Sequence, residues 1–403
     1  MESVHNLIPL QVNIGGQLAD HEIIGRNATV KEMLGYLDRG MNLTINDPRR
    51  IGKSASLQLL EATSTKKRTI VMTSVQPVHR LDQFLLHLLQ LLHEHQSMGR
   101  RVSKTIGEYI DGTGVGMEVG DIPYSVSLRR NHQHKTTLTL LREMVSAING
   151  ALNDDEMLVL AIDEFTEAIL NIASTPDVGA AEATKLLQTL QMLRKENPRV
   201  RWILTGSIGM HHAIRQTNCT SSVVNGDCKN VPVGPLSLED AEHLSRCLAL
   251  GEGIELTDDA HSLLASAVDG IPILVHAVID DLRKQQTKTF DADAIESALH
   301  RYINDKDEAR TFEHFVTRLA TYYSAEELAT ARAILDRSAS RRKPYKAAKL
   351  IDFVSDRLNV DEEQVRVVLA MIEDDHYLTN IDGRMSWRYP ILARVWRAKR
   401  GLN

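Results

Sequence analysis

The sequence predicts an α/β domain built on a parallel sheet, followed by helical segments. Over roughly the first two hundred residues, short runs rich in β-branched residues alternate with longer helical patterns. This alternation is typical of a parallel sheet covered by helices on both faces. From Leu238 onward the strand-like runs stop, and amphipathic helices with short polar links take over. The expected strands span residues 42–46, 69–74, 158–163, 202–205 and 230–233.

We expect three domains along the chain, because 403 residues is two to three times the usual domain size. The α/β domain is assigned residues 1–236, a helical domain residues 237–310 and a C-terminal domain residues 311–403. Ser237 marks the start of the helical domain, because serine is a good helix N-cap and Asp240 follows three residues later. Within the first domain, glycine-punctuated alternation over residues 106–130 predicts an inserted hairpin.

The C-terminal domain has the pattern of a winged helix. Its sequence predicts helices near residues 325–337, 346–358 and 361–374, and then a hairpin over residues 377–389. The dipeptide Asp382-Gly383 at the centre of that hairpin is a typical tight-turn signal.

Composition excludes several classes of protein. A hydrophobic content of 43% with 25% charged residues is ordinary for a folded globular chain, and a net charge of −6 argues against a surface that coats nucleic acid throughout. The longest apolar runs, 157–162 and 367–372, are far shorter than the roughly 20 residues of a membrane helix. The first residues lack a secretion signal, and three cysteines are too few for a disulfide framework, so we expect a cytoplasmic protein with reduced thiols.

The most informative motif spans residues 45–54, directly after an expected strand and at the start of a helix. It nearly matches the phosphate-binding pattern G-x-x-x-x-G-K-[ST]. Such a loop binds phosphate through backbone N–H groups and the helix N-terminus, while the lysine meets the β and γ oxygens and the hydroxyl holds magnesium. The expected nucleotide contacts are Pro48, Arg49, Arg50, Ile51, Gly52, Lys53, Ser54 and Ala55.

One position departs from this pattern, because Asp47 stands where the first glycine is usual. A side chain there narrows the backbone conformations of the loop, and a carboxylate near phosphates is unfavourable unless it points away. The alternative interpretation of the whole segment is a strand-turn-helix corner with a chance Gly-Lys-Ser.

A second motif, at residues 157–164, is a fully apolar run that ends in Asp163 and Glu164. A central parallel strand needs such a run, and acids at its carboxyl end lie where ligands bind in open α/β sheets. We expect Asp163 to order a magnesium ion and Glu164 to polarise the attacking water. An acidic helix start after an ordinary strand is the alternative, and the order and spacing of the two motifs favour the nucleotide site.

A third motif, at residues 200–207, is another strand that runs into a small polar turn. Thr205 and Ser207 are candidates for sensing the γ-phosphate, and Ser207 fits equally well as the cap of the next helix. The adjacent histidines His211 and His212 lack the i, i+4 spacing of a helical zinc site, which favours solvated or capping histidines.

Taken together, the motifs resemble a known family. They are Ile24-Gly25-Arg26, the loop at 48–54, Ile162-Asp163-Glu164, Leu204-Thr205-Gly206-Ser207 and Pro235-Leu236-Ser237-Leu238-Glu239-Asp240-Ala241. Residues 23–282 thereby resemble the archaeal-type ATPases, which belong to the STAND branch of AAA-like P-loop ATPases. The segment Arg388-Tyr389-Pro390-Ile391-Leu392 is similar to the tails of that family.

The resemblance implies a P-loop NTPase sheet of order 5-1-4-3-2, with ATP or ADP and Mg²⁺ as cofactors. It implies a helical lid in which Gly270-Ile271-Pro272 lies near the nucleotide, so that Pro272 joins the cofactor-binding residues. It also places Ile24, Gly25 and Arg26 by the adenine or the phosphates. The assigned roles are therefore Glu164 and Lys53 for catalysis, Ser54 and Asp163 for the metal, and Ser207 as a further nucleotide contact.

Three functions are compatible with these motifs. The leading hypothesis is a slow Mg²⁺-dependent ATPase that acts as a regulatory switch and controls self-association or a separate effector protein. The rival is an AAA-like DNA-associated initiator or transposition-type loader. The third is a nucleotide-locked scaffold with little hydrolysis, which Asp47 motivates.

The expected recognition helix over residues 361–375 argues against the DNA-associated rival. It carries one arginine, Arg366, among the acids Asp361, Glu362, Glu363, Glu373, Asp374 and Asp375. DNA phosphates would repel that helix. Weak DNA contact is therefore expected only through the wing and the tail, where the cations are Arg384, Arg388, Arg394, Arg397, Lys399 and Arg400.

Overall fold

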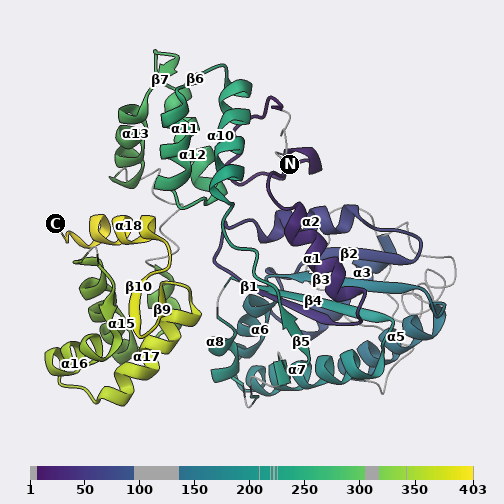
Figure 1. Cartoon of the computed structure of the whole chain (residues 1–403). Coiled ribbons are helices and arrows are strands. Elements are labelled where there is room, and N and C mark those ends of the chain that lie inside the picture. The colour runs from purple at the N-terminus through teal and green to yellow at the C-terminus, as the bar shows by residue number, and fades with distance from the viewer. Residues whose placement is uncertain are drawn as a thin grey trace. The chain divides into compact units, whose positions relative to one another are not determined.

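The computed structural model divides into two compact units (Figure 1). The sheet unit comprises Arg26–Asp47 and Lys53–Val233, and the helical unit comprises the residues up to Gly25, Pro48–Gly52 and Gly234–Asn403. The structure describes residues 7–94, 136–207, 209–217, 219–220, 223–224, 226–304, 317–341 and 343–402. The hairpin expected at 106–130 lies outside the described residues. Among the helices that are described, none is long and apolar enough to cross a membrane.

The sheet unit is built on five parallel strands. They are β1 (Asn42–Asn46), β2 (Arg68–Ser74), β3 (Met157–Asp163), β4 (Val200–Gly206) and β5 (Cys228–Asn230). From one edge to the other the order is β5-β1-β4-β3-β2, with parallel pairing throughout. The α/β fold and the strand order 5-1-4-3-2 are thus confirmed.

The fifth strand differs from its predicted bounds. The apolar residues Val231 and Val233 suggested a strand over 230–233, whereas β5 ends at Asn230. Beyond that point the Val231 N–H still donates to the Thr44 carbonyl at 2.9 Å, and the Val233 N–H instead donates to a side chain of the loop after β1. The pairing therefore ends early because a side chain takes over the backbone bond.

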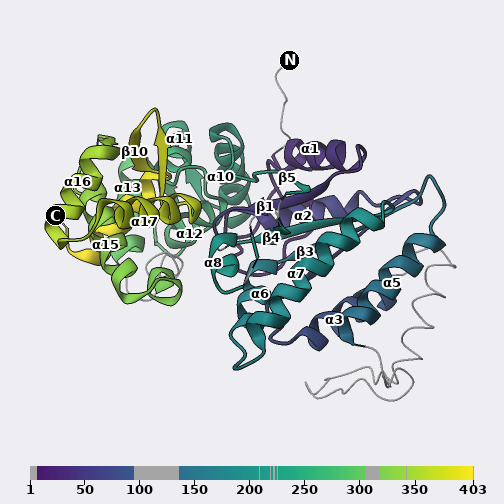
Figure 2. The same ribbon diagram turned by 90° about the horizontal axis from the view of Figure 1, so that it is seen from below.

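Helices cover both faces of this sheet. Figure 2 shows α1 (Asn27–Leu37) and α2 (Lys53–Ala62) on one face. The other face carries α3 (Leu81–Glu94), α5 (Thr137–Ala151), α6 (Phe165–Ala173) and α7 (Gly179–Glu196), and a short helix, α8 (Met210–Arg215), follows β4. Strand β3 lies between covered faces, and its residues from Leu158 to Asp163 are all buried. Burial on both faces explains why that strand reads as a continuous apolar run.

The expected division into three domains stays a prediction, and the segment 238–304 of the helical unit is largely helical. It holds α10 (Leu238–Glu252), α11 (Asp258–Ala267), α12 (Pro272–Arg283) and α13 (Ala292–Asn304). The Ser237 hydroxyl accepts a hydrogen bond from the Asp240 N–H at 3.0 Å, as expected of an N-cap. Two short parallel strands, β6 (Glu255–Leu256) and β7 (Thr289–Phe290), were not expected. Strands of two residues are too short to show the alternation of apolar and polar side chains by which a strand is predicted from sequence.

Residues 317–402 form the C-terminal part of the helical unit, in which α15 (Ala325–Ala339), α16 (Ala347–Leu358) and α17 (Glu362–Asp374) are followed by a hairpin. The hairpin joins β9 (Leu378–Ile381) to β10 (Arg384–Trp387), and β8 (Tyr345–Lys346) completes an antiparallel sheet of order β8-β10-β9. Asp382 and Gly383 both have positive φ, 51° and 74°, as a type I′ turn requires.

A last helix, α18 (Pro390–Arg400), was interpreted from the sequence as a tail. Pro390 suits the first turn of this helix, because backbone N–H groups there have no partner within the helix and proline has no N–H. Its buried side chains recur at helical spacing and bind it to the rest of the C-terminal part; they are Ile391, Leu392, Val395 and Trp396.

Asp375, which follows α17, does not belong to the acidic surface predicted for that helix. Its side chain is 1% exposed, and its carboxylate accepts a hydrogen bond from the Tyr323 hydroxyl at 2.7 Å. The Arg318 guanidinium donates to the Asp375 carbonyl at 2.9 Å. Asp375 therefore contributes to the core of the C-terminal part, because its charge is buried among partners.

Asp269, just after α11, caps α18 from a distance in the sequence. Its carboxylate accepts a hydrogen bond from the Ile391 N–H at 2.7 Å, while its own φ of 53° is left-handed. Burial raises the pKa of the Asp269 carboxyl to about 6, against the opposing effects of the Ile391 N–H and the nearby charge of Arg394.

Replacing Asp269 by asparagine is expected to raise the thermal midpoint at pH 7.5. Because the pKa of Asp269 is higher in the folded protein than in the unfolded chain, protonation of this carboxyl stabilises the fold. This contribution to the free energy of unfolding is complete below about pH 4 and is lost as the pH rises through about 6. Asparagine keeps an acceptor for Ile391, tolerates a left-handed φ and carries no charge. The gain over wild type should shrink at pH 4.5, and a gain equal at both pH values would contradict this account. Asp269→Ala, which lacks the acceptor, should be destabilised at both.

Candidate nucleotide-binding site

The loop after β1 contains two residues with positive φ angles, a backbone conformation that glycine adopts more easily than other residues. Gly52 has a φ of 106°, which lies in the region that favours glycine, and Arg50 has a left-handed φ of 66°. Ile51 between them is buried, with 1% of its surface exposed. Helix α2 starts directly afterwards at Lys53, so the N–H groups of its first turn, which lack partners within the helix itself, follow this loop.

The Lys53 side chain extends back over the loop and reaches its first residue, Asp47. Its ammonium group donates to the Asp47 carbonyl oxygen at 2.7 Å, and the residue is 5% exposed. A buried ammonium requires oxygen partners, and this carbonyl supplies one of them. The positive charge is thereby held between the first residue of the loop and the first residue of the helix.

The carboxylate of Asp47 points toward the end of β5. It accepts a hydrogen bond from the Val233 N–H at 2.8 Å, and Asp47 is 1% exposed. The Val233 carbonyl in turn accepts from the Arg26 guanidinium at 3.1 Å. Asp47 has no positive φ, unlike Gly52, so this position does not require glycine. The aspartate is thus a structural residue that ties the loop to the strand beside β1.

Asp163, at the carboxyl end of β3, collects hydrogen bonds from both other motifs. The Ser54 hydroxyl donates to its Oδ2 at 2.5 Å, and the Thr205 hydroxyl donates to its Oδ1. The residue is 4% exposed. Parallel pairing of β1 with β4 and of β4 with β3 brings the carboxyl ends of all three strands to one edge.

Glu164, the next residue, has an unusual backbone. Its φ of 54° and ψ of 35° are left-handed, a conformation that costs a non-glycine residue about 1–2 kcal/mol. The Glu164 N–H donates to the Thr205 hydroxyl at 3.2 Å, and its Oε2 accepts from the Ser207 hydroxyl at 2.6 Å. Such strain is typical of functional sites, where surrounding contacts hold it in place.

Ser207 is not the cap of the next helix, which was one of its two sequence interpretations. The N-cap of α8 is Gly209, and no side chain caps that helix. Ser207 is 2% exposed and turns toward Glu164. No signal within the motif itself indicated that this serine pairs with the second acid.

The structure of this chain is similar to that of a Walker-type ATPase of Pyrococcus abyssi, with a TM-score of 0.63 and 13% sequence identity. That similarity covers 96% of this chain and 99% of the other. The Aeropyrum pernix ORC2 protein, solved in ADPNP–ADP complexes, is similar with a TM-score of 0.51 and 13% identity over 99% of this chain and 98% of its own. This chain has the fold of a P-loop ATPase. Neither a protein-family model nor a curated protein matches its sequence.

Within this P-loop ATPase fold, the role of Ser54 and Asp163 as magnesium ligands stays a prediction. Their oxygens lie 2.5 Å apart, and hydroxyl and carboxylate oxygens are the hard ligands that Mg²⁺ prefers. The remaining predicted contacts divide between the units. Arg26 lies in the sheet unit beside Val233, whereas Ile24, Gly25 and Pro272 belong to the helical unit, where their role at the nucleotide stays a prediction.

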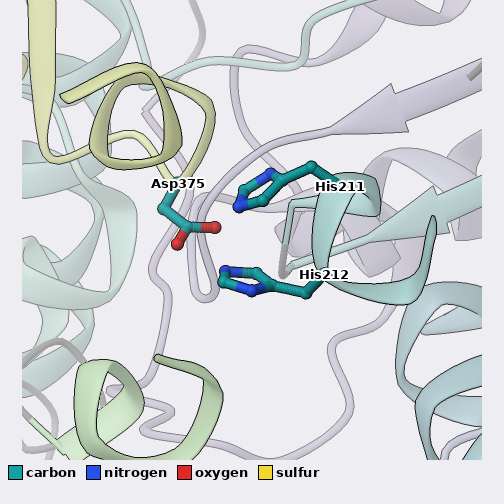
Figure 3. Close-up of side chains that lie close together, drawn as sticks. All are labelled: His211, His212 and Asp375. Atoms are coloured by element: carbon teal, nitrogen blue, oxygen red, sulfur yellow. The ribbon is translucent and has the colours of Figure 1, made fainter. Parts of the chain in front are cut away.

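The adjacent histidines His211 and His212 lie at the start of α8 in the sheet unit. Figure 3 shows the rings of His211 and His212 side by side, with centroids 4.0 Å apart and an interplanar angle of 42°. His212 is 3% exposed. Asp375, drawn in the same view, belongs to the helical unit and has the partners described above. We assign the ring contact to packing within α8.

Proposed function

We propose that this protein is a Mg²⁺-dependent ATPase of the archaeal, STAND-like type that works as a regulatory switch. One observation carries the proposal: a continuous set of hydrogen bonds joins Ser54 to Asp163, Asp163 to Thr205, and Glu164 to Ser207. These residues come from three motifs far apart in the sequence. Their meeting at one edge of the sheet is what phosphate transfer from ATP requires.

Each side chain has a defined role in this proposal. Backbone N–H groups of the loop and the first turn of α2 bind the phosphates, while Lys53 donates to the β and γ oxygens. Ser54 and Asp163 hold Mg²⁺, which supplies charge stabilisation at the transferring phosphoryl group when bound. Glu164 accepts a proton from the attacking water, and Ser207 orients Glu164 through the 2.6 Å hydrogen bond.

The helical unit supplies the moving element of the proposed switch. Gly270 and Ile271 precede Pro272, the first residue of α12, and a side chain at Gly270 is excluded because its Cβ would lie 2.3 Å from the Leu236 carbonyl oxygen. Gly270 also has a φ of 67°. The backbone of this motif thus packs tightly against the segment that leads into α10. We propose that nucleotide exchange moves this packed body and so changes self-association or the presentation of the C-terminal part to an effector protein.

The switch is tested by measuring assembly in two nucleotide states. Sedimentation velocity of the full chain with Mg²⁺ and a non-hydrolysable ATP analogue should differ from sedimentation with ADP. A pull-down from the host lysate with the same nucleotides covers the case of a separate effector. Identical sedimentation and identical captured proteins in both states would contradict the switch, and phosphate release measured in parallel reports on the ATPase independently.

DNA affinity is expected to be weak, tolerant of sequence and steeply dependent on salt. Arg366 of α17 already forms salt bridges with Glu362 and Glu363, so that helix offers phosphates no free cation. The wing carries Arg384, which is exposed, and Arg388. A labelled duplex should lose most of its affinity for R384E/R388E at low salt and keep it for Q364A/R366A. The reverse result, with sequence-selective binding, would favour a DNA-associated loader.

A further inference from the structure

The helical unit contains a cavity of about 560 Å³. The end of α15 and the segment after it, strand β10, helix α18 and Glu296 of α13 line this cavity. All of these elements belong to the same compact unit. The cavity has the size of an ordinary small-molecule site, and none of its residues takes part in the nucleotide site described above.

The charged residues of the cavity are predominantly cationic. Four cations line it, against the single carboxylate of Glu296; they are Arg341, Lys343, Arg394 and Arg397. Glu296 is already paired with Arg394 at 3.0 Å. A chain with a net charge of −6 has no general excess of cations, so this concentration is local. It favours a ligand that carries several negative charges.

Neighbouring groups hold two of these cations in place. The Arg397 guanidinium donates to the Ala339 carbonyl at 3.1 Å, and the Arg341 guanidinium lies 5.0 Å from the centre of the Tyr345 ring. Guanidinium groups fixed in this way lose less conformational freedom when they bind a ligand.

Two buried donors in the cavity wall lack partners. Ser338 and Trp387 both line the cavity and are 7% and 9% exposed. The Ser338 hydroxyl and the Trp387 indole N–H form no hydrogen bond with any residue that the structure describes. An indole N–H can only donate, and a hydroxyl can donate as well as accept. Both atoms are shielded from solvent, so a ligand in the cavity does not reach them in this structure, and the four cations alone favour an anion.

We propose that this cavity binds a phosphate ester, a free small molecule with at least two negative charges. Phosphate offers acceptor oxygens on all sides and matches the fork of a guanidinium group, as the cations of the wall require. A concave site of this volume can accommodate a small molecule. The backbone of a duplex would instead meet the exposed wing, where Arg384 lies.

The test uses the full chain with Lys53→Ala, so that the loop after β1 does not compete for the probe. Inorganic pyrophosphate is titrated by calorimetry, and Trp387 fluorescence gives a second readout. We expect binding at one site, weakened at least tenfold in R341E/K343E. The matched control K349E/R357E also reverses one arginine and one lysine, both exposed on α16, and should bind as the parent does.

A conservative variant guards against effects on folding. R397Q removes the positive charge but keeps a side chain that can donate to the Ala339 carbonyl, and it should weaken pyrophosphate binding several-fold while the thermal midpoint without ligand stays the same. Failure of the K53A protein to bind pyrophosphate at millimolar concentration would overturn the proposal, as would equal weakening by both charge reversals.

A duplex titration identifies the source of the phosphate. If R341E/K343E loses affinity for a short duplex but not for pyrophosphate, the cavity contacts a nucleic-acid backbone and the proposed small ligand is wrong. All of these binding measurements use the K53A protein. Their outcome therefore does not depend on whether the wild-type protein hydrolyses ATP.

Discussion

Lys53→Ala is expected to lose most of the affinity for ATP and ADP. The Lys53 ammonium is 5% exposed and fixed across the loop by the Asp47 carbonyl, so it contributes a preorganised charge to phosphate binding. Removing one partner of a buried charge pair typically costs about 2–5 kcal/mol, which is roughly thirty-fold to several-thousand-fold in Kd. Calorimetric titration with Mg²⁺ and each nucleotide measures the loss directly.

Thermal stabilisation gives an independent measure of the same effect. A ligand at a hundred times its Kd stabilises the folded protein by about 2.7 kcal/mol, and K53A should lose nearly all of that stabilisation. Lys66→Ala is the control, because Lys66 is an exposed lysine of the same unit. Equal stabilisation of wild type and K53A by Mg²⁺ and ATP would show that the loop does not bind phosphate through this lysine.

Glu164→Gln is expected to keep ATP binding and to reduce phosphate release by about 10²–10⁴-fold, the usual contribution of a general base. Glutamine retains the shape of the side chain and an oxygen that accepts from Ser207, but it cannot take a proton from water. Asp163→Ala should impair both binding and turnover, since Asp163 accepts from Ser54, from Thr205 and from the Glu164 N–H.

The matched control for the catalytic acid is Glu167→Gln, one turn further along α6. It makes the same chemical change on the same helix and should leave turnover near the wild-type value. Ser207→Ala should fall between the two, with a larger effect on turnover than on ATP affinity, because it acts by positioning Glu164. Phosphate release at the wild-type rate by E164Q would assign the base to another residue.

Where a structural feature depends on neighbours in the chain, the sequence predicted it well. Strands β1 and β3 are found where their runs of apolar and β-branched residues predicted them, since burial on both faces requires such runs. Ser237 caps α10 because its partner, Asp240, is only three residues away. The Asp382-Gly383 turn is likewise a local matter of backbone conformation.

Features that depend on distant residues could not be predicted in this way. The early end of β5 and the orientation of Asp47 have one cause, the hydrogen bond from the Val233 N–H to the Asp47 carboxylate. Asp375 looked like one more surface acid until its pairing with Tyr323 showed that it is buried. Helix α18 was missed because its apolar side chains need the rest of the C-terminal part to pack against.

The sequence by itself determined the α/β class and the chemical groups available at the loop and the strand ends, because propensity, burial pattern and turn chemistry act over a few residues. Only the tertiary structure decided which of those groups meet. Ser54, Asp163 and Thr205 share hydrogen bonds because parallel pairing aligns the ends of their strands, and Ser207 faces Glu164 because that residue adopts a left-handed backbone. Such contacts depend on the register of strands far apart in the chain, and that register is set by packing of the whole sheet.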